Sequence, residues 1–193
     1  MSDDLDRLAD DFWEAVLRFQ PTYRHMLGDY RDVGSWERCS QDAEDRHVAE
    51  LRDLVGAAEA IEPAGLTDDQ RLTRDVMIAS ATTTADLTAT PLTGLAANPV
   101  SGPQRQLALV LGLLSVPDET VAAQMPAKLE AAGTYLHELA ERTRSAAADG
   151  WVSAEFVVTE TLEQLDHLLA APVEEDPVVE AVAVPDGVDA DAL

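Results

Sequence analysis

Apolar residues recur every three or four positions along most of the chain, which is the spacing of helices with one buried face. The clearest case is Lys128–Ala171, where two such segments meet at Asp149-Gly150. We predict an antiparallel helical hairpin there, because Gly150 tolerates the positive φ of a helix end and Ser153 can cap the next helix. The two predicted stripes are Met125, Leu129, Ala132, Leu136, Leu139 and Thr143, then Val158, Leu162, Leu165 and Leu169.

Three further long helices are predicted upstream of this hairpin. The first runs from a cap at Asp3 or Asp4 to about Phe19, and Pro21 stops it. The second spans about 41–61 behind an N-cap at Ser40, and the third follows a capping box of Thr67 and Gln70. Their predicted inward faces are Leu5, Leu8, Phe12, Val16 and Phe19; Val48, Leu51, Val55 and Ala58; and Leu72, Val76, Ala79, Thr83 and Leu87.

Shorter segments complete the prediction. A short helix over 21–27 should end at Gly28, and a proline-rich loop should lead to a helix that begins at Pro103. That helix is apolar nearly all round over 107–116, so we expect it to be central to the domain or covered by a partner. Segment 172–193 contains repeated prolines and acidic residues without a basic partner, so we expect it to be poorly ordered.

The fold class that follows is all-α. We expect an antiparallel bundle or array of about six helices over 1–171, forming one domain, with an acidic tail at 172–193. No internal repeat is evident in the sequence, which argues against a solenoid.

Charge limits the possible partners. The chain has 37 acidic and 13 basic residues, a net charge of −24, and Lys128 is the only lysine. Such a surface repels nucleic acid and anionic lipid, since both are bound by clustered Lys and Arg. Two interpretations of the excess remain open, a host with a salty cytoplasm and the codon bias of a high-GC genome.

The predicted cellular compartment follows from features that the sequence does not contain. No run of 18 apolar residues is present, which predicts no transmembrane helix, and the first residues do not form a secretory signal. A single cysteine, Cys39, cannot form an internal disulfide and fits a reducing cytoplasm. We therefore expect a cytoplasmic protein.

Two histidine-containing motifs were weighed as metal sites. His137-Glu138 lacks the second histidine of the zinc motif His-Glu-x-x-His, since Glu141 occupies that position. Together with Glu130, Thr134 and Arg144, these residues trace a polar helix face, so we expect a solvated surface. Glu44 and His47 form a single Glu-x-x-His, whereas di-iron bundles use two, and we expect His47 at the surface or rim.

The remaining candidates are weaker. Glu163 and His167 are one helical turn apart and are expected to form a surface pair. Ser101 lies in a loop without a nucleophile motif, and Cys39 has no low-pKa setting. Trp13, Trp36 and Trp151 are too scattered to form a stacking platform, and no phosphate-binding glycine loop or dinucleotide motif is present in the sequence. We expect no catalytic, cofactor-binding or metal-binding residue.

Several short stretches together resemble the DUF885 family of bacterial proteins, over about residues 1–170. Their order along the chain carries the resemblance more than any one of them. The stretches are Phe12-Trp13-Glu14, Gln20-Pro21-Thr22-Tyr23-Arg24, Leu27-Gly28-Asp29, Leu66-Thr67-Asp68-Asp69-Gln70-Arg71-Leu72, Val100-Ser101-Gly102-Pro103-Gln104, and Gly150 to Leu165 with its Gln-Leu ending.

The resemblance implies a mostly helical protein that is similar to zincin-type metallopeptidases. Proteins of this family are expected to be much longer than this chain. Their His-Glu-x-x-His helix lies beyond the matched region, so their zinc ligands have no counterparts here. The chain also has Ala154-Glu155 where the family is expected to show Pro-Arg, which puts any anion-binding role at that point in doubt.

Three hypotheses follow. The favoured one is a non-catalytic helical scaffold or binding module, which contacts a protein partner or another copy through the 107–116 helix or the 172–193 tail. The second is part of a zinc-dependent peptidase-like hydrolase whose catalytic half is lost or supplied by another chain. The third is a metal-binding helical bundle that uses Glu44, His47, His137 or Glu141.

Overall fold

The computed structural model describes the backbone of residues 2–181. It confirms the all-α class, because the described residues form no strand and contain six helices of seven or more residues. These residues form two compact units. The first contains the chain up to Phe19 together with Ser40–Leu92, and the second contains Gln20–Cys39 and the described residues from Thr93 onward. The prediction of one domain over 1–171 stays a prediction.

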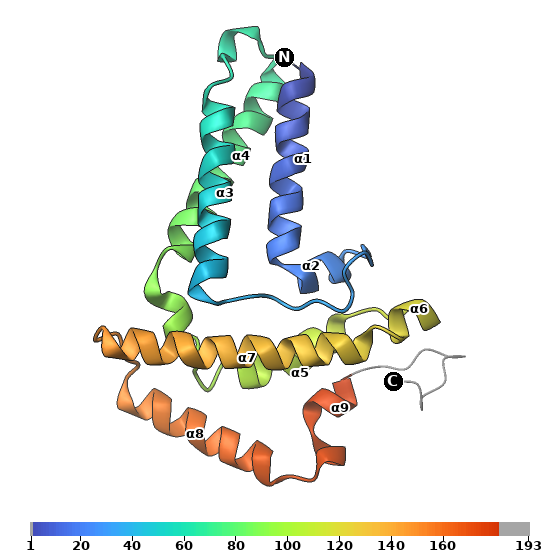
Figure 1. Cartoon of the computed structure of the whole chain (residues 1–193), viewed down its shortest axis with the longest axis vertical. Helices are drawn as coiled ribbons and strands as arrows, with labels where there is room; N and C mark the ends of the chain where they lie inside the picture. The colour runs from blue at the N-terminus through green and yellow to red at the C-terminus, as the bar shows by residue number, and fades with distance from the viewer. Residues whose placement is uncertain (1, 182–193) are drawn as a thin grey trace. The chain divides into compact units, whose positions relative to one another are not determined.

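The first unit is a bundle of three long helices, α1 (Ser2–Phe19), α3 (Gln41–Glu59) and α4 (Asp68–Thr88) (Figure 1). A 3₁₀ turn, Pro63–Gly65, lies between α3 and α4. Local sequence signals set the starts of α3 and α4 as predicted, whereas α1 begins at Ser2, so the predicted caps Asp3 and Asp4 lie inside the helix. The Ser40 hydroxyl accepts the amide of Ala43, and Thr67 and Gln70 form the reciprocal capping box. The core contains Val48, Leu51, Ala81 and Ala85, with Phe12 and Val55 packed against them.

The predicted inward face of α4 is wrong. Leu72, Val76 and Leu87 are more than half exposed, and the buried side chains are Met77, Ala81 and Ala85. These buried residues recur every four positions, as one helix face requires. Two of the three are alanines, whose small side chains let α3 and α4 approach closely, so packing favours the less hydrophobic face.

The second unit is built on the long helix α7. A hydrophobic core joins it to the 20–39 segment and to α5, and consists of Val33, Trp36, Leu111, Leu114, Val116, Val121, Ala122, Met125 and Ala132. The α5 helix contributes Leu111 to this core, with Leu107 and Val110 packed against it, whereas Leu109 and Leu113 are each 57% exposed. The elements are α2 (Pro21–Met26), a 3₁₀ turn that starts in the first unit (Pro91–Leu95), α5 (Pro103–Leu113), α6 (Glu119–Ala122), α7 (Met125–Ala148), α8 (Glu155–Ala170), a 3₁₀ turn (Val173–Glu175) and α9 (Pro177–Ala181).

Two glycines end helices in this unit at positive φ, as predicted. Gly28 follows α2 with φ +80°, and Gly150 follows α7 with φ +87°. In each case the amide after the glycine donates to the carbonyl five residues earlier, at 3.2 Å and 2.8 Å. This is the Schellman motif, which satisfies the last carbonyls of a helix and turns the chain out of it.

The two helices of the predicted hairpin follow one another as expected. The prediction of which face of α8 is buried is wrong. Val158, Leu162, Leu165 and Leu169 are 43%, 55%, 36% and 83% exposed. The helix packs on its unit through Thr161, which is buried, and the half-buried Val157, Gln164 and Leu168. A shift of one residue rotates a helix face by about 100°. The predicted core stripe is thus an exposed surface.

Two smaller expectations also change. The N-cap of α8 is Ala154, without a side-chain hydrogen bond, and not Ser153. Within the segment expected to be poorly ordered, Val173–Glu175 and Pro177–Ala181 are helical, and Val178 packs against the second core. Residues 182–193 lie outside the described residues.

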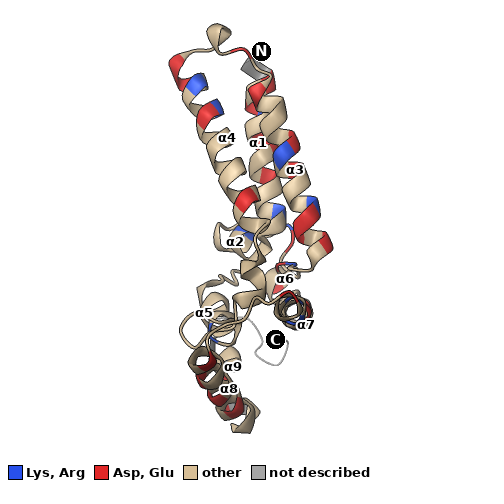
Figure 2. Cartoon of the chain, turned by 90° about the vertical axis from the view of Figure 1, so that its left-hand side faces the viewer, with Lys and Arg blue, Asp and Glu red and all other residues tan. Residues whose placement is uncertain are grey.

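Acidic residues occur along the helices of both units (Figure 2). The described helices include none with the length and apolarity needed to cross a bilayer.

Candidate functional site

A groove between α5 and α8 has a volume of about 740 Å³. Its floor and walls belong entirely to the second unit. The described lining residues are Gln104, Arg105 and Ala108 of α5; Glu160, Glu163, Gln164, His167 and Leu168 of α8; and Pro177 of α9. This set offers charged and amide contacts beside apolar ones and contains no serine, threonine, cysteine or lysine. The described lining is therefore suited to contact a ligand, and its ionisable side chains are carboxylates, a guanidinium and an imidazole.

Two stretches that carry the family resemblance meet at this groove. The Gln104 amide donates to Gln164 Oε1 at 3.2 Å, although the two residues are 60 positions apart. Gln164 donates in turn to the Pro99 carbonyl at 3.1 Å, and Gln104 donates to the Asn98 carbonyl at 2.8 Å. Both glutamines are thereby held in place, and they fix α8 against the loop that leads into α5.

The geometry of the same loop explains why position 102 is a glycine. Asn98 Oδ1 accepts the amides of Val100 and Ser101 at 3.0 Å and 2.8 Å, which closes a tight turn. A Cβ on Gly102 would lie 2.3 Å from the Asn98 carbonyl oxygen and 2.4 Å from Gln104 Oε1. Only glycine fits without displacing these groups. Ser101 takes part in this turn, since its hydroxyl lies 3.2 Å from Asn98 Nδ2.

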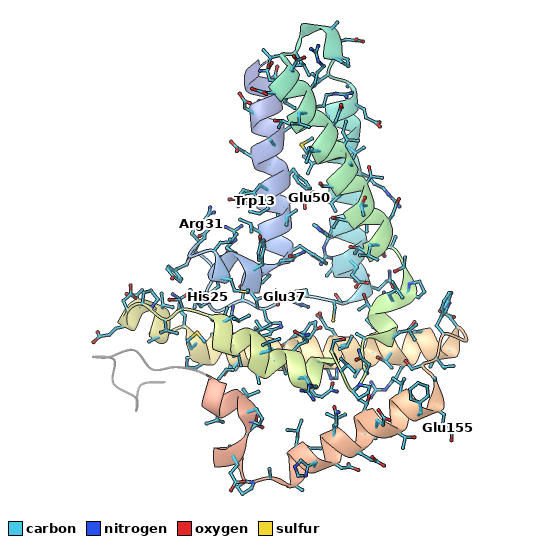
Figure 3. All side chains as sticks on the ribbon, turned by 180° about the vertical axis from the view of Figure 1, so that it is seen from behind. Trp13, His25, Arg31, Glu37, Glu50 and Glu155 are labelled. Atoms are coloured by element: carbon cyan, nitrogen blue, oxygen red, sulfur yellow. The ribbon has the colours of Figure 1, made fainter. Side chains whose placement is uncertain are left out.

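A second polar cluster fixes the 20–39 segment. Glu37 accepts the Thr22 amide at 3.1 Å and also the Thr22 hydroxyl. Arg24, which is buried, pairs with Asp29 at 2.9 Å, and Arg31 also binds Asp29 from outside. The Arg31 guanidinium is the main reason that the pKa of Asp29 lies well below its usual range. Glu37 and Arg31 are labelled in Figure 3.

Residues of the Gln-Pro-Thr-Tyr-Arg and Leu-Gly-Asp stretches therefore have structural roles. Pro21 starts α2, Thr22 and Arg24 tie the segment together, and Gly28 and Asp29 close its turn.

Lys128 is fully buried in α7, which its polar character did not predict. Its ammonium donates to the carbonyls of Val33 and Ser35 at 3.1 Å and 2.7 Å, and it lies 5.5 Å from the centroid of the Trp36 ring. Burial lowers its pKa from 10.5 to about 8, because a charged group is disfavoured away from water, while Glu37 opposes this shift. The lysine anchors the 33–36 turn on α7.

His25 is a second buried ionisable group in this unit (Figure 3). Its Nε2 lies 2.7 Å from the Ser115 carbonyl, while Nδ1 has no hydrogen-bond partner among the described residues, and Tyr30 packs edge-on against the ring. Burial lowers the pKa of His25, and the nearby positive charge of Lys128 acts in the same direction. A neutral imidazole with its proton on Nε2 satisfies the Ser115 contact.

The histidines weighed as metal ligands belong to different units. His47 was expected at the surface or rim but is buried, stacked on Phe19 at a centroid distance of 3.9 Å, and burial lowers its pKa. Glu44 is buried in the same unit. His137 and Glu141 are exposed on α7, in the second unit. Across the described part of the chain, no group of three or more His, Cys, Asp or Glu side chains has metal-binding geometry.

Other expected candidates have structural or surface positions. Glu138 binds Arg38 and accepts the Cys39 amide at 2.9 Å, so it ties the 20–39 segment to α7. Cys39 is buried, and its Sγ lies 3.5 Å from the Tyr135 carbonyl. Glu163 and His167 are exposed, and both line the groove. Glu155, in the first turn of α8, lies where a negative charge stabilises the helix dipole.

Sequence reasoning missed Lys128, His25 and the pairing of Gln104 with Gln164. Lys128 did carry a signal, since the only lysine of an acidic chain occurs three residues after Met125 and four before Ala132, on the apolar stripe. The glutamines occurred in the stretches used for the resemblance, but nothing local indicated that they meet.

Comparison with known proteins agrees with the resemblance. A family model described as "Bacterial protein of unknown function (DUF885)" matches residues 21–192. Searches of curated proteins and of solved structures give no match. Since the family model covers most of the chain, the protein belongs to the DUF885 family.

Proposed function

We propose that this chain is a non-catalytic helical scaffold or binding module. The observation that carries the proposal is the exposed apolar stripe of α8, whose four members were expected to form core. Contiguous apolar surface on a folded domain marks an interaction site more often than isolated apolar residues do. A surface of this kind is suited to hold a partner.

The polar residues of the family stretches support the same interpretation. Thr22, Arg24 and Asp29 hold the 20–39 segment together, and Gln104 and Gln164 hold α8 to the loop before α5. These hydrogen bonds and ion pairs fix the segments that carry them, and so hold the exposed face of α8 in a defined place on its unit. The open groove adds charged, amide and apolar contacts beside it, and its described lining contains no hydroxyl, thiol or amine side chain.

The proposal is tested by assaying the purified chain for peptide hydrolysis. A panel of fluorogenic peptides is incubated with and without added Zn²⁺, and a zinc peptidase at the same concentration serves as positive control. We expect the chain to match buffer alone under both conditions. Zinc-dependent turnover that a chelator abolishes would overturn the proposal.

A second candidate follows from the resemblance to zincin-type metallopeptidases. In that case the chain is part of a peptidase-like hydrolase, and its exposed α8 face contacts a catalytic half that another chain supplies. This candidate predicts a neighbouring reading frame that encodes His-Glu-x-x-His, and a genome without such a frame would count against it. The metal-binding bundle lacks comparable support, because the described residues contain no group of three or more His, Cys, Asp or Glu side chains that could hold a metal ion.

A further inference from the structure

The exposed stripe of α8 has the spacing of a coiled-coil seam. Val158, Leu162, Leu165 and Leu169 follow one another at intervals of four, three and four residues, which places them at d, a, d and a of a heptad. The seam is about 16 Å long at 1.5 Å per residue. All four side chains are more than one-third exposed, so a second helix can insert its own apolar residues between them.

The charged residues on and beside this seam are all acidic. Asp166 occupies the e position next to Leu165, Glu163 occupies b, and Glu155 extends the seam at its N-terminal end. All three are exposed. No lysine or arginine follows Arg144 in the sequence, so neither α8 nor the acidic 172–193 segment supplies a compensating charge.

We propose that the α8 seam binds a basic amphipathic helix of another protein. The proposal rests on the binding-module function and names its partner class. The partner presents leucine-like residues at a and d, and Lys or Arg at the positions that face Asp166, which flanks the seam, and Glu155, which lies at its N-terminal end. Two alternatives fit less well. A second copy would bring two acidic flanks together in a chain of net charge −24, and the 172–193 segment carries no positive charge.

The test uses three fluorescently labelled synthetic helices of three heptads, at nanomolar concentration, titrated with the full chain in an anisotropy assay. The first has Leu at a and d and Lys or Arg at e and g. The second keeps the leucines but has Glu at e and g, and the third keeps the basic flanks but has Gln at a and d. We expect the first helix to bind at least about tenfold more tightly than either of the others, since loss of buried apolar anchors or of charge complementarity costs at least that factor.

Variants of the chain locate the binding face. Leu162→Glu and the milder Leu169→Ser should each weaken binding of the basic helix at least about tenfold. Leu87→Glu is the matched control, because Leu87 is similarly exposed on α4 of the other unit, and it should leave binding unchanged. Circular dichroism confirms that each variant remains folded.

Four results would overturn the proposal. They are no binding of the basic helix, equal binding of the acidic helix, binding that neither α8 variant weakens, and self-association of the chain that Leu162→Glu abolishes. The last would identify a second copy as the occupant. None of these results implies hydrolysis, so the assay for peptide cleavage tests the proposed function separately.

Discussion

At the scale of single residues, Lys128 is the most distinctive group in the protein. It is the only lysine in the sequence, it is fully buried, and its ammonium is held by two backbone carbonyls. Burying a charge is unfavourable unless hydrogen bonds compensate, and the lowered pKa of about 8 shows that compensation is incomplete.

This residue predicts an unusual dependence of stability on pH. Its folded pKa lies below the unfolded value of 10.5, so the unfolded chain binds more protons at this site between pH 8 and 10. The free energy of unfolding should therefore rise by roughly 2 kcal/mol across that range. Urea denaturation at pH 8, 9 and 10 measures it.

Lys128→Met is the control for this effect, because it keeps the apolar stem and removes the ionisable amine. The variant should show a flat profile over the same range. Burial raises the pKa of Tyr135 above its unfolded value of 10.0, so that tyrosine opposes the trend weakly from about pH 9 and fully only at higher pH. A stability that falls between pH 8 and 10 in the unmodified chain would contradict the structure.

At the scale of elements, the loop before α5 depends on Gly102. A Cβ there would collide with the Asn98 carbonyl and the Gln104 side chain, so Gly102→Ala should destabilise the chain by roughly 1–3 kcal/mol. Gly133, inside α7, has no atom within 4 Å of its built Cβ. Gly133→Ala should therefore stabilise by roughly 0.5–1 kcal/mol, through helix propensity alone.

Urea denaturation of the two glycine variants beside the unmodified protein checks this pair of predictions. If Gly102→Ala is neutral, the tight turn at Asn98 is described wrongly. If Gly133→Ala destabilises the chain, the open surround of α7 at that point is wrong.

Element boundaries were largely predictable, because local chemistry determines them. The Ser40 cap, the Thr67 capping box and the glycines that end α2 and α7 each act within a few residues. Which face of a helix is buried was less predictable. On α4 and α8 the buried face was displaced from the most hydrophobic one, because the choice depends on neighbours that are distant in sequence.

The candidate site was the least predictable part. The groove forms only when α5 and α8 meet, and the hydrogen bond between Gln104 and Gln164 spans 60 residues. Periodicity and spacing contain no information about such a contact. The family resemblance pointed to both stretches without indicating that they pair.

At the scale of the whole molecule, the net charge of −24 is the dominant property. Like charges repel in the folded state, and salt reduces that repulsion, with a Debye length of about 3 Å at 1 M. If the composition is an adaptation to a salty cytoplasm, the melting temperature should rise markedly from low to molar KCl. Thermal denaturation followed by circular dichroism measures this response, and a flat profile would favour codon bias.

The central claim is that the most hydrophobic stripe of α8 is surface and not core. Thiol labelling tests it most directly, because Cys39, the only cysteine, is buried and serves as an internal reference. In a Leu162→Cys variant, we predict that a maleimide modifies the new thiol nearly as fast as it does in the urea-unfolded chain, while Cys39 reacts much more slowly. Equal protection of the two thiols in the folded protein would place Leu162 in the interior and contradict the account.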